Sequence, residues 1–166
     1  CAGSFLMEAG NYTGDGVNGK VISLSFDPDL VIIKADAALL GVWSTSLATN
    51  LTHYVAAAVA AFTGAITSMG SNSFTLGTNS TVNQSLTVYE YIAFGNATSP
   101  HTGAGACDFF VGKYIGNVAP TSTKIIDHLG IHPNIVVVAR DTGGLAPVWR
   151  SSSMPDNNSA YFTATI

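Results

Sequence analysis

A single Asp-Thr-Gly motif carries the residue types of acid–base catalysis. Asp141, Thr142 and Gly143 form the tripeptide of aspartic proteases, in which two carboxylates held close together share one proton. The chain contains this tripeptide once, so a protease would require a symmetric dimer. Arg140 precedes the aspartate and Gly144 follows it, which is typical of a turn closed by an Asx-type hydrogen bond. We therefore interpret the motif as a turn and predict that the protein is not an enzyme.

A pair of histidines has a spacing that is known from zinc sites. His128 and His132 are four residues apart, which would place them on one face of a helix. Gly130 and Pro133 oppose a helix at this point. On a strand the two side chains would lie about 13 Å apart, too far to share an ion. We therefore interpret both histidines as solvated loop residues.

Two aspartates offer the oxygen ligands that calcium prefers. Asp27 and Asp29 flank Pro28, but two carboxylates are too few for a calcium site. Capping of the turn before the next strand explains them better. No phosphate-binding glycine loop, cysteine–histidine cluster or nucleophile–base pair stands out in the sequence. The sequence predicts no metal and no cofactor.

Two tryptophans have side chains that can stack on sugar rings. Trp43 and Trp149 each follow a valine and occupy equivalent places in two similar stretches of the chain. This equivalence favours a role in core or inter-sheet packing. Glycan stacking is the alternative.

One pattern of residues occurs twice in the chain. Residues 26–34 read FDPDLVIIK, and residues 131–138 read IHPNIVVV. The flanking motifs recur in the same order: a tyrosine and a glycine before the run (12–14 and 114–116), Val-Trp after it (42–43 and 148–149), and a later tyrosine (Tyr54 and Tyr161). Such self-similarity indicates one structural unit used twice. We predict a complete first unit at 1–98, a linker at 99–106 and an incomplete second unit at 107–166.

The local patterns are those of short β-strands. Residues 21–26 alternate as VISLSF, and residues 30–33 form a continuous apolar run. The alanine-rich residues 54–62 are ambiguous because alanine favours helix, but their neighbours favour strand, and we predict a strand. Further strands are expected at 4–8, 41–46, 65–69, 73–78 and 86–94, and in the second unit at 109–114, 124–129, 134–140, 147–150 and 159–166. This organisation predicts an all-β fold, an antiparallel β-sandwich or jelly roll.

Several of these motifs together resemble a known repeat family. The pieces are YTGDG at 12–16, FDPDLVIIK at 26–34, VWSTS at 42–46, TNSTVN at 78–83 and YEYIAF at 89–94. They resemble a repeat that occurs in phage tail-fibre or tail-associated proteins and in tandem arrays on bacterial surface proteins. The second copy matches again from Phe109 through Phe162. The resemblance implies an extracellular β-sandwich module of structural or adhesive type, and it supplies no catalytic residues.

The charge balance bears on partners and location. Charged residues make up 10% of the 166 residues, and the formal net charge is −4. A nucleic-acid-binding protein would be expected to carry a basic patch, so the sequence predicts no nucleic-acid partner. No apolar run approaches the about 20 residues of a membrane span. A surface wetted mainly by Ser, Thr, Asn and Gly suits an extracellular protein or one on a cell or virion surface.

Six Asn-x-Ser/Thr triplets are candidate glycosylation sites in such a location. They begin at Asn11, Asn50, Asn79, Asn83, Asn96 and Asn157. Some triplets arise by chance in a chain this rich in Asn, Ser and Thr. Glycosylation is therefore a hypothesis, and it predicts an intact mass above the 17.1 kDa of the bare chain.

The two cysteines, Cys1 and Cys107, leave three interpretations open. Both precede the first strand of a unit, so a disulfide between them fits a secreted chain. Two unpaired thiols are the second interpretation. A lipid anchor on Cys1 is the third, because lipoproteins mature by cleavage immediately before a cysteine.

The incomplete second unit leads to the functional prediction. Nothing after residue 166 matches the first unit's residues 65–94, so the apolar strand at 159–166 would leave an uncovered edge and core face. We predict that a neighbouring copy covers it by β-strand addition, with interface candidates Tyr161, Phe162, Ile166, Phe5 and Leu6. The expected function is a structural subunit of an extracellular filament or surface assembly, a homopolymer. A longer array that supplies the missing strands is a second explanation of the incomplete unit. The functional alternative is a glycan-binding adhesin or tail-fibre-type module that uses Trp43 and Trp149.

Overall fold

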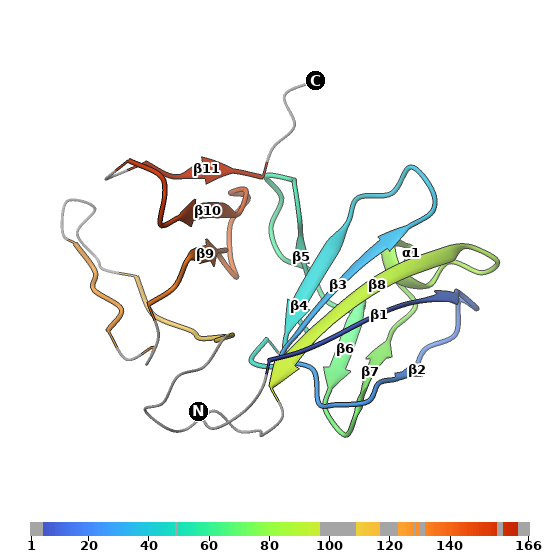
Figure 1. Ribbon diagram of the computed structural model, residues 1–166. Coiled ribbons are helices and arrows are strands. Elements are labelled where there is room, and N and C mark those ends of the chain that lie inside the picture. Colours follow the sequence, from blue (N-terminus) through green and yellow to red (C-terminus); the bar gives the residue numbers. More distant parts are fainter. Residues whose placement is uncertain are drawn as a thin grey trace.

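The computed structural model describes residues 5–48, 50–96, 109–116, 123–127, 129, 132–155 and 158–162. These residues form three antiparallel sheets of five, three and three strands, with one short helix (Figure 1). The predicted all-β antiparallel fold is confirmed. Within the described ranges no helix is long and apolar enough to cross a membrane.

The largest sheet has the strand order β1-β8-β3-β4-β5. Its strands are β1 Phe5–Thr13, β8 Val88–Asn96, β3 Leu30–Ala35, β4 Val42–Thr45 and β5 His53–Tyr54. All neighbours are antiparallel. The alternating sequence of β8 gives this sheet one buried face and one exposed face. Tyr89, Tyr91 and Ala93 face the core while Glu90 and Ile92 face outward, as the two-residue period of a strand requires.

A second sheet packs on the first and closes the core of the first unit. It has the order β2-β7-β6, with β2 Lys20–Ser23, β7 Ser73–Leu76 and β6 Ile66–Met69. The core between the sheets contains fully buried side chains from both: Val31, Ile33, Val42, Ile66, Phe74, Leu76 and Tyr89. Burying each such side chain is worth about 1.5–3 kcal/mol. The first unit is thus a closed sandwich.

A four-residue helix, α1 (Ser80–Asn83), lies between β7 and β8. Two stacked tyrosines hold it: the Tyr12 hydroxyl donates to Val82 O at 2.6 Å, and the Tyr89 hydroxyl donates to Ser80 O at 2.6 Å. Burial raises the pKa of both hydroxyls. Both therefore stay protonated, as donation requires.

The predicted strand over the alanine-rich residues 54–62 is wrong. The strand there, β5, spans only His53–Tyr54, and an isolated bridge joins Thr52 to Phe62. Val59 between them is exposed. Alanine side chains bury too little apolar area to hold a strand against the core, so the segment crosses the surface as a loop.

The third sheet repeats part of the first sheet with the same register. Its order is β11-β10-β9, with β9 Ile135–Val138, β10 Val148–Ser151 and β11 Ala160–Tyr161. When the two motifs are aligned, all four β9–β10 pairs and both β10–β11 pairs match those of β3–β4 and β4–β5. Val137 lies opposite Trp149, for example, as Ile32 lies opposite Trp43.

The match extends to a hydrogen bond outside the strands. Asn134 O accepts from Ser152 N at 2.9 Å, and at the aligned position Asp29 O accepts from Ser46 N at 2.9 Å. The repeated sequence pattern therefore corresponds to repeated backbone pairing. The predicted linker at 99–106 and both of its boundaries lie outside the described residues.

Two strands predicted for the second unit do not form. Residues 109–116 and 123–127 are described and contain no strand. Their counterparts in the first unit are β1, which pairs only with β8, and β2, which pairs only with β7. Among the described strands the second unit shows no counterpart of β7 or β8, so neither segment pairs with a described strand, whereas β9, β10 and β11 pair with one another.

Candidate interaction surface

Asp141 lies near two basic side chains. Its Oδ1 is 3.5 Å from His53 Nε2, and its Oδ2 is 3.2 Å from Lys113 Nζ. Burial lowers the pKa of His53, an effect that the carboxylate of Asp141 opposes. Gly143 has a φ of 84°, a conformation that favours glycine in a tight turn. The geometry fits a turn that contacts the first unit.

Only one histidine of the pair lies within the described residues. His128 lies outside the described residues, and the side chain of His132 is exposed. Among the residues that the structure describes, no three His, Cys, Asp or Glu side chains are grouped so that they could hold a metal ion.

The two aspartates beside Pro28 brace neighbouring loops. Asp27 Oδ1 accepts from the backbone N–H of Asn72, and Asp29 Oδ1 accepts from the Ser46 hydroxyl at 3.1 Å. Each carboxylate therefore joins the segment before β3 to a residue distant in the sequence.

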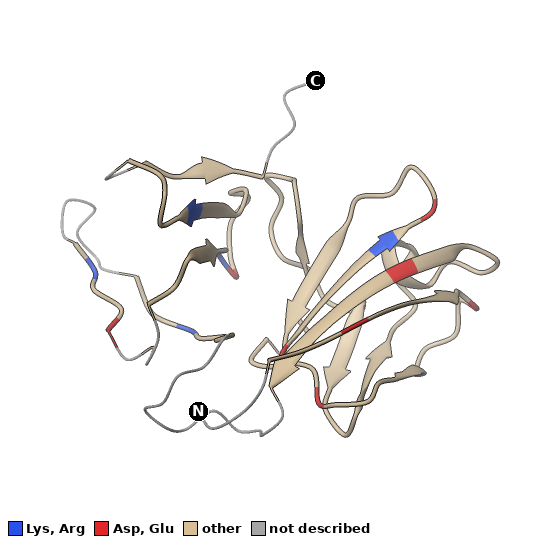
Figure 2. Cartoon of the chain, viewed as in Figure 1, with Lys and Arg blue, Asp and Glu red and all other residues tan. Residues whose placement is uncertain are grey.

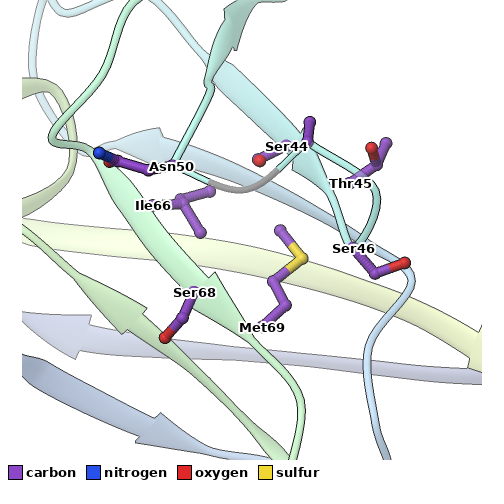
Figure 3. A pocket seen from close by; sticks show the side chains of 8 residues that line it. Ser44, Thr45, Ser46, Asn50, Ile66, Ser68 and Met69 are labelled. Atoms are coloured by element: carbon purple, nitrogen blue, oxygen red, sulfur yellow. The ribbon is translucent and has the colours of Figure 1, made fainter. Parts of the chain in front are cut away.

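A small pocket lies between β4 and β6 (Figure 3). Its volume is about 80 Å³, well below the about 300–1,000 Å³ of ligand sites. Its lining side chains are Ser44, Thr45, Ser46, Ala48, Asn50, Ile66, Ser68 and Met69. The Ser44 hydroxyl is already used, because it donates to Leu51 O at 2.7 Å. The pocket suits a few waters better than an organic ligand.

The two tryptophans occupy equivalent positions in β4 and β10, and both are half-buried. Trp43 is stacked on His53, with ring centroids 4.6 Å apart. The ring of Trp149 lies 6.0 Å from that of Phe162, in a tilted arrangement. The contact with His53 supports a packing role for Trp43.

Three of the candidate glycosylation asparagines keep some exposure. Asn11 and Asn50 are exposed, and Asn79 is half-buried. Asn50 Oδ1 accepts from Gly64 N at 2.9 Å, and Asn79 Oδ1 accepts from Thr81 N at 2.9 Å as the cap of α1. Asn157 lies outside the described residues.

Two other candidates are buried in the folded chain. Asn83 has no exposed surface, and its Nδ2 donates to Val17 O and Gly77 O, both at 2.9 Å. Asn96 is 3% exposed. A glycan on Nδ2 of either residue would have no room in this fold, which restricts the hypothesis to the remaining positions.

Cys1 and Cys107 lie outside the described residues, so the three cysteine interpretations stay open. The interface candidate Ile166 also lies outside the described residues. Of the other interface candidates, Phe5 stacks on Phe94 at 5.9 Å and Leu6 is half-buried, both in β1. Tyr161 is 62% exposed, and Phe162 is half-buried.

The second unit exposes an apolar strand whose counterpart in the first unit is more deeply buried. Val31 in β3 is 0% exposed, whereas the aligned Val136 in β9 is 40% exposed. Its neighbours Ile135 and Val137 are 65% and 46% exposed. β9 carries no charged residue, and it is drawn without charge colouring in Figure 2. The same type of strand is thus a core element in one unit and surface in the other.

Both β9 and β11 end the third sheet among the described strands, but only β9 differs in this respect from its counterpart in the first unit. In the first unit β5 ends the sheet, and its counterpart β11 ends the third sheet in the same way. The other edge of β3 holds β8 over six residue pairs, whereas β9 ends its sheet. The sequence analysis placed an uncovered edge at 159–166, of which 163–166 lie outside the described residues. Aligning β9 with β3, whose partner is β8, points to β9 as a further open edge among the described strands.

Comparison of the chain with protein-family models, with curated proteins and with solved structures gave no match.

Proposed function

We propose that the protein is a structural subunit of an extracellular filament or surface assembly, in which copies join by addition of a strand to the second unit. The observation that carries this proposal is the open edge of β9: Ile135, Val136 and Val137 are exposed, whereas the aligned strand β3 is paired with β8, its Val31 is buried, and its Leu30 and Ile32 are half-buried. An unpaired, uncharged, apolar edge is the form of strand that soluble proteins normally protect.

The energetics support coverage of this surface. Each large apolar side chain left in water forgoes about 1.5–3 kcal/mol of burial. The side chains of β9 together with Tyr161 therefore forgo an amount comparable with the roughly 5–15 kcal/mol net stability of a domain. Strand addition would also satisfy the free backbone groups of β9.

The extracellular setting has separate support. The chain is poor in charge, with 10% charged residues, and exposed glycosylation triplets begin at Asn11 and Asn50. The resemblance to repeats of phage tail proteins and bacterial surface arrays agrees with a structural role outside the cell.

Glycan binding is the second candidate. It is favoured by one observation: Ala160 lies opposite Trp149 where His53 lies opposite Trp43, so Trp149 lacks the cross-strand histidine that stacks on Trp43. A glycan array comparing the wild type with Trp149→Ala tests it. Binding that the variant loses would support this candidate, and binding that the variant keeps would count against it.

Self-association of the full chain tests the main proposal. We expect the mass measured by size exclusion with light scattering to rise with protein concentration, and negative-stain microscopy to show elongated particles. A chain that stays monomeric at every concentration would overturn the proposal.

A further inference from the structure

We propose that the copies join head to tail through two named strands, with the free edge of β1 in one copy pairing antiparallel with the free edge of β9 in the next. The inference rests on the proposed function and deepens it by naming both surfaces.

The acceptor edge has two backbone N–H groups pointing outward. Asn134 O accepts from Ser152 N on the β10 side. Because the trans peptide is planar, the N–H of Ile135 points the opposite way, toward the open edge. Alternation along the strand gives the N–H of Val137 the same direction. In the first unit the aligned edge of β3 is the one that holds β8.

The donor edge can be located by the same argument. Gly14 N donates to Thr87 O on the β8 side at 2.8 Å. β1 pairs with β8 in unbroken register, so the amides of alternate residues, Met7, Ala9 and Asn11, point away from β8. β1 ends its sheet, and no described strand pairs with that side.

Other strands are weaker donors. β8 is held on both sides by β1 and β3, so donating it would open the first unit. β5 and β11 have two residues each, β2 begins with Lys20, and β6 pairs with an irregular register. β1 has nine residues and exposes Phe5 and Met7.

The direction of pairing follows from the topology. β1 is antiparallel to β8, which is antiparallel to β3, so β1 runs parallel to β3. β9 is the counterpart of β3, and its free edge and that of β1 lie on the same side of their sheets. Rotating one copy by half a turn about an axis perpendicular to the sheet brings the free edge of its β1 beside the free edge of β9 in the other copy. The core-facing sides of the two sheets then lie on the same side of the joined sheet. That rotation makes the two strands antiparallel, as β8 is on β3.

In this pairing the apolar side chains of β1 and β9 also lie on the same face of the joined sheet. Met7 and Ala9, whose amides point outward, are exposed residues on the outer face of β1. Val137, whose amide also points outward, aligns with Ile32 on the outer face of β3. Pairs between these residues therefore keep apolar outer side chains together, and the core-facing Val136 stays on the core side. Because the two edges differ, the contact is heterologous and builds an open filament.

Two proline variants test the pairing. Val137→Pro removes an outward N–H of the acceptor, and Ala9→Pro removes one of the donor, at edge positions where proline breaks no intrachain ladder bond. We expect each variant alone to stay monomeric while the wild type assembles. An equimolar mixture should give a heterodimer and nothing larger, because only one intact β1 edge and one intact β9 edge remain between the two.

Matched controls keep the backbone amide. Val137→Ala and Ala9→Ser should assemble like the wild type. Val137→Asp and Ala9→Asp keep the amide but place a charge at each edge, so they repeat the mixing test if a proline variant loses its unfolding transition. Two results would overturn the inference but leave the proposed function standing, provided that the wild type assembles. Either an edge-blocked variant also assembles when alone, or the mixture of the two variants stays monomeric. A monomeric wild type overturns the proposed function and the inference together.

Discussion

Single polar side chains hold the loops of the first unit, and Asn83 does so with three hydrogen bonds. Its Oδ1 accepts from Asp15 N at 2.9 Å, and its Nδ2 donates to the carbonyls of Val17 and Gly77. The side chain has no exposed surface. It therefore links the loop after β1 to the end of β7.

Replacing this asparagine should be costly. We expect Asn83→Ala to lower the free energy of unfolding by about 2–4 kcal/mol, because buried backbone partners would lose their hydrogen bonds. Urea unfolding followed by circular dichroism measures the change. Asn11→Ala, at an exposed asparagine of β1, is the matched control and should change stability by less than about 0.5 kcal/mol. Equal effects of the two substitutions would contradict the role of Asn83.

His53 should make stability depend on pH. Its folded-state pKa is lowered, first by burial, with Asp141 raising it and Lys113 lowering it further. The unfolded chain therefore binds this proton more readily. The contribution of neutral His53 to the free energy of unfolding is full above the ordinary histidine pKa of about 6.5. It is lost as the pH falls through the folded-state pKa.

The measurement is the urea midpoint between about pH 8 and about pH 5, a window in which histidines titrate. We expect the midpoint to fall with pH in the wild type and to fall less in His53→Gln. His132→Gln, at an exposed histidine, should keep the wild-type slope. A slope that His53→Gln leaves unchanged would refute the assignment.

At the scale of elements, equivalent glycines of the two units have different surroundings. A Cβ on Gly14 would lie 2.2 Å from Gln84 O, whereas a Cβ on Gly116 would meet no atom within 4 Å. Gly14 follows β1 where the chain passes the end of α1. The repeat keeps the glycine in both places, but only the first unit has the backbone that requires it.

This difference predicts unequal effects of one substitution. Gly14→Ala should lower stability by about 1–3 kcal/mol, because the backbone at Gln84 would have to move. Gly116→Ala should be close to neutral in the monomer. Thermal unfolding of both variants checks this, and a loss of stability in Gly116→Ala as large as that in Gly14→Ala would contradict the open second unit.

The sequence predicted elements well where pattern and partner coincide. The apolar run at 30–33 became β3, and the alternating 86–94 became β8, because each has neighbours on both sides. Residues 109–114 have an equally apolar pattern but form no strand, since pairing depends on a partner that pattern alone does not show. The candidate site shows the same limit: apolarity pointed to 159–166, of which 163–166 lie outside the described residues, whereas pairing order points to β9.

At the scale of the whole molecule, the two strands of the proposed junction carry a single charged residue, Glu8. β9 has no ionisable residue, and the one acidic residue of β1, Glu8, accepts hydrogen bonds from Ser25. We therefore expect assembly to be nearly unaffected by raising the salt concentration, which screens exposed charges, and to be strengthened by sulfate. Light scattering across a salt series measures this. Dissociation in moderate salt would indicate an electrostatic interface instead.

The central claim is that β9 is open in the monomer and paired in the assembly, and hydrogen exchange of residues 132–140 tests it most directly. In the monomer the amides of Ile135 and Val137 should exchange quickly, while those of the aligned strand β3 are protected. On assembly, protection of this segment should rise toward that of β3, and the Val137→Ala control should behave in the same way. Assembled protein in which residues 132–140 exchange as fast as in the monomer would contradict the account.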